Sequence, residues 1–200
     1  MADPIDFYFD FASPYGYLAA QRVDELAADH GREVAWRPIL IGPALKRNGT
    51  TPLMDQPLKG PYVKRDLRRM ARLMEVPFTD PPTFPFAALG AVRGFYWIAD
   101  TDPTSARAFA RAVYNACWGE GLDVTDVDVL GTLADALGID AQAMLAAIQT
   151  DPVKERAKAE VDASLEKGVF GSPFFIVDGE PFWGADRMDM IDLWLESGGW

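Results

Sequence analysis

Two short segments carry the polar groups most suited to chemistry, and each lies where the chain enters or leaves a predicted strand. Ser13 stands between an apolar run and Pro14, a position that favours the N-cap of a helix. A hydroxyl there lies beside the free backbone N–H groups at the positive end of the helix dipole, which together stabilise an anion. An ordinary N-cap serine is the structural alternative. No GxSxG motif surrounds Ser13, so a role as hydrolytic nucleophile is disfavoured.

The second segment is Gly171-Ser172-Pro173, which comes just before an apolar run. A proline at the first residue of a strand removes a ladder hydrogen bond. One reason to keep it is a cis peptide bond, which leaves the preceding backbone free to pair with an extended ligand. The alternative is a trans proline that opens a strand, and the rarity of cis bonds favours that alternative.

The chain has one cysteine, Cys117, and one histidine, His30. A disulfide within the chain, a CxxC redox pair and a cysteine-rich zinc site are therefore excluded, and we expect no metal. Apolar neighbours indicate that Cys117 is an inert core residue. His30 stands before Gly31 at a predicted helix end, which favours a structural role.

The formal net charge is −11, which disfavours nucleic acid as a partner. Eight basic residues against two acids nevertheless lie in the basic segment from Lys46 to Arg72. This segment suits a small anionic ligand, with a solvated helix face as the alternative. The chain has no apolar run near the roughly 18 residues that cross a bilayer. Acids replace the basic start of a signal peptide, so we expect a cytoplasmic protein with no membrane partner.

The elements at the two ends of the chain must position these residues. Alternating apolar residues predict a strand over 5–11, a helix over 14–30 and a second strand over 33–37, which make a β-α-β unit. Near the other end, a helix over 151–167 precedes a strand at 173–178. Asp178-Gly179 predicts a hairpin turn to a strand at 181–183, and a helix over 186–196 follows.

The middle of the chain differs in character. Residues 38–85 hold nine of the fifteen prolines and predict a connector that contains one helix, over 62–74. Further helices are predicted over 86–98, 103–118, 126–137 and 141–149. We therefore predict an α/β protein in which a helical domain, residues 42–150, is inserted into a small domain made of residues 1–41 and 151–200.

Three blocks of sequence resemble a known family: FYFDFASPYGYLA, AVYNACWGEG and GVFGSPFFIVDGEPFWGADRMDMI. They are similar to the 2-hydroxychromene-2-carboxylate isomerases and the kappa-class glutathione transferases, in the DsbA-like group of thioredoxin folds. The resemblance covers essentially the whole chain. It implies a thioredoxin-like domain (β-α-β and β-β-α) with an all-helical insertion, glutathione as cofactor, and a homodimer. Ser13-Pro14-Tyr15-Gly16 stands where redox relatives have CxxC, which excludes disulfide exchange at that turn.

The resemblance also implies roles for single residues. Ser13 would hydrogen-bond the sulfur of glutathione and favour thiolate over thiol. The backbone of Ser172 would pair with the cysteinyl part, and Asp186 would meet the γ-glutamyl ammonium; an acid that complements the helix dipole is the alternative for Asp186. The implied glutathione site comprises Ser13, Pro14, Tyr15, Thr50, Lys59, Ser172, Pro173, Ala185 and Asp186.

The chain departs from its relatives at two places. Thr50 stands where kappa-class relatives have Asn, whereas Lys59 matches a lysine that could neutralise a carboxylate. Residues 81–88 lack two arginines of the naphthalene-pathway isomerases that could hold a substrate carboxylate. Arg93 or the bases at 64–72 could replace them, or the substrate could differ. Aromatic side chains could line a substrate cavity or belong to the core: Phe84, Phe86, Trp97 and Trp118.

Three functions follow as hypotheses. The resemblance implies an isomerase that converts 2-hydroxychromene-2-carboxylate, or a related small aromatic carboxylate, to the trans-benzylidenepyruvate: the thiolate adds, the ring opens, a bond rotates and elimination returns glutathione. The alternative is a kappa-type glutathione transferase, which releases a conjugate. The third is a thioredoxin-like binding module without catalysis, which would hold a ligand at the Pro173 loop.

Overall fold

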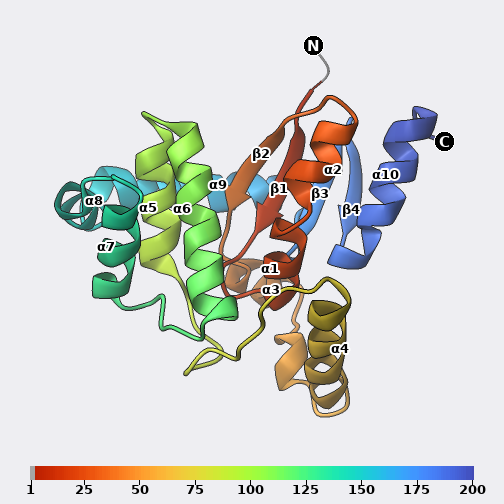
Figure 1. Cartoon of the computed structure of the whole chain (residues 1–200), viewed down its shortest axis with the longest axis horizontal. Coiled ribbons are helices and arrows are strands. Elements are labelled where there is room, and N and C mark those ends of the chain that lie inside the picture. Colours follow the sequence, from red (N-terminus) through yellow and green to blue (C-terminus); the bar gives the residue numbers. More distant parts are fainter. Residues whose placement is uncertain (1–2) are drawn as a thin grey trace.

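A four-stranded mixed sheet organises residues 3–200, the part of the chain that the computed structural model describes (Figure 1). The strand order is β2-β1-β3-β4, with β1 parallel to β2 and antiparallel to β3, and β3 antiparallel to β4. This order joins the predicted β-α-β unit to the predicted hairpin. The strands are β1 (Ile5–Phe9), β2 (Val34–Pro38), β3 (Phe174–Val177) and β4 (Glu180–Trp183).

The alternation of β1 gives the sheet two apolar faces. Phe7 and Phe9 lie on one face, where their rings contact Trp36 and Phe175. Tyr8 lies on the opposite face, in a smaller cluster with Val161, Phe174 and others. Each face therefore needs a covering layer of helices.

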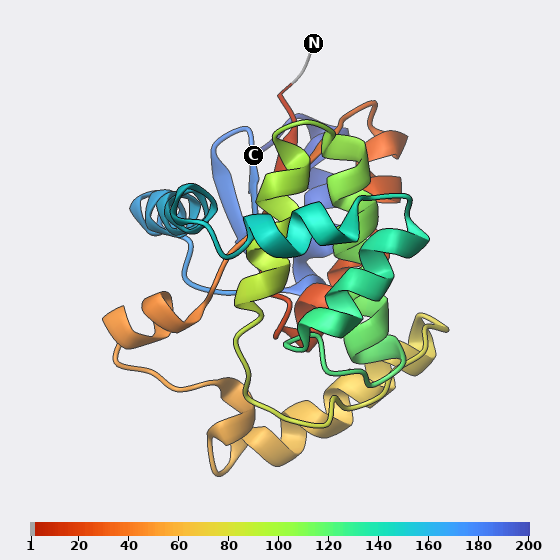
Figure 2. The ribbon, with the colours of Figure 1, turned by 90° about the vertical axis from the view of Figure 1, so that its left-hand side faces the viewer.

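The helices cover both faces and add a layer beside β2 (Figures 1 and 2). Helix α9 supplies Val161 to the Tyr8 face, whereas α2 and α10 pack together on the other. The helices are α1 (Pro14–Ala20), α2 (Val23–Asp29), α3 (Gly42–Arg47), α4 (Lys59–Leu73), α5 (Leu89–Ala99), α6 (Pro103–Tyr114), α7 (Val127–Ala136), α8 (Ala141–Ala147), α9 (Asp151–Glu166) and α10 (Met188–Ser197). Within residues 3–200 no helix is both long and apolar enough to cross a bilayer.

The expectation of one helix over 14–30 is wrong in its middle. The chain forms α1 and α2 with a break at Gln21-Arg22, where the backbone N–H groups donate to Leu18 and Ala19, three residues back, instead of four. The predicted end at His30-Gly31 is confirmed, because Gly31 has a φ of +62° and closes α2.

The connector is more ordered than predicted. It contains α3 and a 3-10 turn, η1 (Leu53–Asp55), and α4 begins at Lys59 instead of Tyr62. Pro43 and Gly49 lie in the segment predicted as a connector, but they act as start and stop signals of α3. Gly60 is required because a Cβ there would collide with the Met54 carbonyl oxygen.

The remaining boundaries differ by a few residues. Strand β1 ends at Phe9 instead of Phe11, and α5 begins at Leu89 instead of residue 86. The helix predicted over 103–118 ends as α6 at Tyr114 and continues as a π-helical turn, η2 (Asn115–Gly119). A 3-10 turn, η3 (Ala185–Arg187), precedes α10.

Candidate functional site

Ser13 is the N-cap of α1, as its sequence context predicts. Its Oγ accepts a hydrogen bond from the Gly16 backbone N–H at 3.1 Å, and Pro14 occupies the first turn. The Ser13 hydroxyl donates to the Ser172 carbonyl oxygen at 2.8 Å. Ser13 and Ser172 both remain partly exposed. The two segments singled out in the sequence therefore meet, although 159 positions separate them.

The Ser172-Pro173 peptide bond is cis, so the expectation of a trans bond is wrong. The Ser172 hydroxyl oxygen accepts a hydrogen bond from the Asp10 backbone N–H at 2.8 Å, which joins the loop before β3 to the end of β1. A Cβ added to Gly16 would lie 3.1 Å from Ser172 Oγ and would collide with the Tyr114 hydroxyl. Gly16 therefore allows Ser13, Ser172 and Tyr114 to converge.

Asp10 lies beneath this turn and is a site residue that sequence reasoning missed. Its side chain accepts hydrogen bonds from the backbone N–H groups of Ala12 at 2.9 Å and Ile41 at 2.8 Å. Its backbone carbonyl accepts from the Ser13 N–H and from the Tyr114 hydroxyl. Burial raises the pKa of the Asp10 carboxyl to about 6, although the two N–H donors act in the opposite direction. An acid inside an aromatic strand, immediately before the turn, is the signal that could have identified it.

Tyr15 connects α1 to the basic helix α4. Its hydroxyl donates to Asp66 Oδ2 at 2.8 Å. Burial raises the pKa of Tyr15, and the carboxylates of Asp66 and Asp186 raise it further. The phenol therefore stays neutral and keeps its proton for this hydrogen bond. Figure 2 shows α4 at the same end of the molecule as α1.

Asp186 lies in η3, which packs against α1. Its side chain is 66% exposed, and an Oδ2 to Arg187 Nη2 distance of 3.7 Å leaves it loosely paired. Gly184 has a φ of +113°, and a Cβ there would collide with the Asp186 carboxylate. Ala185 is buried between them. The structure thus brings the Asp186 segment to the Ser13 turn.

Thr50 and Lys59 lie farther along the connector. Both are exposed, Thr50 after α3 and Lys59 at the first residue of α4. The Thr50 backbone N–H donates to the Leu45 carbonyl at 2.9 Å. Lys59 belongs to the helix that Tyr15 fixes to α1, whereas no described contact links Thr50 to Ser13 within residues 3–200.

Of the four predicted aromatic residues, Phe84, Phe86 and Trp118 gather, whereas no described ring contact within residues 3–200 joins Trp97 to them. Trp118 lies 6.0 Å from Phe84 and 6.5 Å from Phe86 between ring centroids. Trp118 is fully buried, and its Nε1–H donates to the Phe11 carbonyl at 2.8 Å. These contacts favour the core alternative for Trp118. Arg93 lies partly buried on α5.

Cys117 and His30 both have surroundings that favour a structural role. Cys117 is fully buried, and burial raises the pKa of its thiol to about 12. The thiolate form, which is the reactive one, is therefore disfavoured. His30 Nε2 lies 2.7 Å from Asp192 Oδ1 on α10. In the described chain, no group of three or more acidic, histidine or cysteine side chains is arranged to hold a metal ion.

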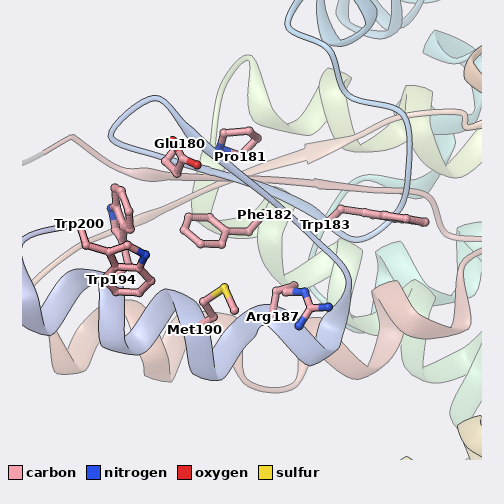
Figure 3. A pocket seen from close by; sticks show the side chains of 8 residues that line it. All are labelled: Glu180, Pro181, Phe182, Trp183, Arg187, Met190, Trp194 and Trp200. Carbon is pink, nitrogen blue, oxygen red and sulfur yellow. The ribbon is translucent and has the colours of Figure 1, made fainter.

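Two hollows lie away from Ser13. One, of about 350 Å³, is bordered by β4 and α10 (Figure 3). The other, of about 530 Å³, lies along β2 and is bordered by α5, α6 and α9. Neither is lined by Ser13, Phe84 or Trp118.

Comparison with known proteins identifies the family of this chain. Residues 4–196 match the family model of the DSBA-like thioredoxin domain. The chain is 32% identical to a 2-hydroxychromene-2-carboxylate isomerase of Sphingobium xenophagum, over 98% of this chain and 99% of that protein. It is 26% identical to glutathione S-transferase kappa 1 of Homo sapiens, over 94% of this chain and 88% of the relative.

A solved structure supports the same relationship. The structure of a 2-hydroxychromene-2-carboxylate isomerase superposes with a TM-score of 0.88 at 31% identity, over 96% of this chain and 94% of that one. The similarity thus covers both the sheet and the helical layer beside it.

Proposed function

Because this chain belongs to the DSBA-like thioredoxin family and, within it, to the 2-hydroxychromene-2-carboxylate isomerase family, we propose that it is a glutathione-dependent isomerase. Its substrate would be 2-hydroxychromene-2-carboxylate or a related small aromatic carboxylate, and its product trans-o-hydroxybenzylidenepyruvate. The observation that carries the proposal is the contact between the Ser13 hydroxyl and the Ser172 carbonyl. We also propose a cytoplasmic location, from the single cysteine, and a homodimer, from the family resemblance.

The residues around Ser13 fit glutathione. A hydroxyl donor is complementary to a thiol, and the backbone before Pro173 is complementary to a peptide. An exposed carboxylate is complementary to an ammonium, and a basic helix to carboxylates. When bound, glutathione would supply a thiolate nucleophile. Ser172 would pair with its cysteinyl part, Asp186 with its ammonium, and Lys59 with a carboxylate.

Ser13 would act as a hydrogen-bond donor that lowers the pKa of the glutathione thiol. Its hydroxyl proton points to the Ser172 carbonyl in this structure and can turn about the Cβ–Oγ bond. The Gly16 N–H holds the oxygen in place during that rotation. A hydrogen bond to the charged form favours the thiolate.

The test is a calorimetric titration with glutathione, together with thiolate absorbance against pH, for the wild type and Ser13→Ala. A hydrogen bond to a charged group contributes about 1.5–3 kcal/mol. The pKa of the glutathione thiol should therefore be about one to two pH units higher in Ser13→Ala than in the wild type. Ser197→Ala is the matched control, because Ser197 is an exposed residue at the end of α10. Equal thiol pKa values in the wild type and Ser13→Ala would refute the role of Ser13.

A kappa-type transferase is the second candidate, supported by the human kappa-class relative. Product analysis separates the two activities. An isomerase returns all of the glutathione when 2-hydroxychromene-2-carboxylate is converted, whereas a transferase consumes one glutathione for each conjugate formed. Failure of the wild type to bind glutathione would contradict both and favour a thioredoxin-like binding module.

A further inference from the structure

Strand β2 is one edge of the sheet, and part of its backbone faces away from β1. The Ile5 N–H donates to the Glu33 carbonyl at 2.8 Å, and the Ile39 N–H donates to the Phe9 carbonyl at 2.7 Å. In a parallel pair, alternate residues direct both backbone groups to the neighbouring strand. Glu33 and every second residue after it therefore face β1.

It follows that Val34 and Trp36 face outward, each with one N–H and one C=O. The next outward residue is Pro38, which has no N–H, and its carbonyl already accepts the Tyr96 hydroxyl at 2.8 Å. Among the residues that the structure describes, the free part of the edge, whose outward groups have no described partner, thus extends from Val34 to Trp36. It is long enough to pair with a segment of about three residues.

This free edge opens into the hollow of about 530 Å³, not onto a flat surface. Helix α6 borders the hollow on one side and α9 on another. The Trp36 residue is only 7% exposed. Backbone polar groups in folded proteins are nearly always hydrogen-bonded, so the outward groups of Trp36 can pair with a ligand that enters the hollow. The volume is in the range of small-molecule sites, about 300–1,000 Å³.

The opposite edge of the sheet does not offer the same pairing. The Gly184 N–H donates to the Pro173 carbonyl at 3.1 Å, so Pro181 and Trp183 of β4 face outward. Pro181 has no N–H and interrupts the row of donors, as edge prolines commonly do. Figure 3 shows Pro181 at the hollow beside α10.

Arg107 gives the β2 hollow a cation whose guanidinium makes no described hydrogen bond within residues 3–200. Asp24 accepts from Arg111 Nη2 at 2.8 Å and from Trp36 Nε1 at 3.0 Å, whereas Arg107 Nη1 lies 3.7 Å from it. The Arg107 side chain is 40% exposed. The other arginines that line the hollow have closer carboxylate partners, at 2.6–2.7 Å: Arg32, Arg37 and Arg156.

We propose that the hollow along β2 binds a short, free, extended peptide that carries a carboxylate. The peptide lies beside β2 as an added strand and forms backbone hydrogen bonds with Val34 and Trp36. Its carboxylate pairs with the Arg107 guanidinium. This site is separate from the Ser13 turn, and the proposal does not depend on the isomerase activity.

Three peptides without a thiol test the proposed site. They are N-acetyl-trialanine with a free carboxylate, the same peptide with a C-terminal amide, and the free acid with N-methylated backbone amides. Titrations followed by ¹⁵N–¹H NMR should shift the Val34 and Trp36 amide signals. The acid should bind about tenfold more tightly than the amide, because its carboxylate accepts a charge-assisted hydrogen bond from Arg107. The N-methylated form should bind weakly, because it cannot donate to the strand.

Two variants separate the contributions. Arg107→Gln should remove the preference for the acid. Arg22→Gln is the control, because Arg22 pairs with Asp189 and does not line the hollow. Val34→Pro deletes only an outward N–H and should weaken every probe about fivefold. If Val34→Pro does not fold, the N-methylated probe on the wild type still tests the strand pairing, because it removes the donors of the peptide instead of the donor of the strand. No shift at Val34 and Trp36, equal binding of the N-methylated probe, or an acid preference retained in Arg107→Gln would each overturn the proposal.

Discussion

Asp10 shows how one buried carboxyl can hold several parts of the candidate site. Its side chain joins the start of the Ser13 turn, through Ala12, to the loop before α3, through Ile41. Its backbone contacts both Ser172 and Tyr114. A buried carboxylate is costly, and the two N–H donors offset only part of that cost, so the pKa of the carboxyl is raised to about 6 and the group is protonated below that pH.

This raised pKa predicts a pH dependence of stability. The native protein keeps the Asp10 proton up to about pH 6, whereas the unfolded chain loses it near 3.8, so the stabilisation from Asp10 falls as the pH rises between these values. Between about pH 4 and about pH 7, the free energy of unfolding of the wild type should fall by about 2–3 kcal/mol relative to Asp10→Asn. Denaturant titrations across this range measure the difference. Asp135→Asn, at an exposed acid, should keep the wild-type profile, and parallel profiles for wild type and Asp10→Asn would contradict the assignment.

At the scale of elements, α1 fixes the position of the basic helix through its two tyrosines. The Tyr15 hydroxyl donates to Asp66 on α4, and the Tyr17 hydroxyl donates to the Pro77 carbonyl at 2.7 Å. Helix α4 lies at one end of the molecule, away from the sheet (Figure 2). These hydrogen bonds therefore set where Lys59 and the arginines of α4 stand relative to Ser13.

Tyr15→Phe should loosen α4 and weaken glutathione binding. One hydrogen bond contributes about 0.5–1.5 kcal/mol, so we expect glutathione affinity to fall about two- to tenfold. Amide hydrogen exchange should become faster in α4 but remain unchanged in β1. Tyr62→Phe is the matched control, because Tyr62 is exposed on the same helix. Wild-type protection of α4 in Tyr15→Phe would show that packing alone holds the helix.

At the scale of the whole molecule, the helical layer and the sheet share one apolar core. Phe9 of β1 packs against Tyr114 of α6 at 5.4 Å and Phe95 of α5 at 6.3 Å between centroids. The side chains of Tyr114 and Trp118 donate to backbone carbonyls of Asp10 and Phe11. The inserted segment, proposed as residues 42–150, thus supports the turn that carries Ser13.

This shared core predicts a single cooperative unfolding transition. Calorimetric and van't Hoff enthalpies should agree, and tryptophan fluorescence and circular dichroism should give one midpoint. Trp118→Phe leaves the Phe11 carbonyl without its donor and should lower stability by about 1–3 kcal/mol without splitting the transition. Two resolved transitions, in either protein, would indicate that the inserted segment unfolds independently.

The sequence by itself determined the features that depend on near neighbours. Ser13 and Pro14 begin a helix, Gly31 ends the next one, and Asp178-Gly179 makes the hairpin turn, where both residues have positive φ. Local capping and turn chemistry act over a few residues, so their signals remain readable in one sequence. The three blocks of sequence that resemble a known family indicated that family. The resemblance also implied the roles of Ser13, Ser172 and Asp186.

Only the tertiary structure decided which groups meet. The hydrogen bond from Ser13 to Ser172 crosses 159 positions, and the burial of Asp10 depends on β1, the loop before α3, α6 and the Pro173 loop together. Pro43 and Gly49 are compatible with a loop, and they are equally compatible with the start and the end of a helix. The outward edge of β2 depends on strand order and on the helices around it. Burial and long-range pairing are properties of the packed chain. Local sequence patterns therefore did not predict the Ser13–Ser172 contact, the burial of Asp10 or the outward edge of β2.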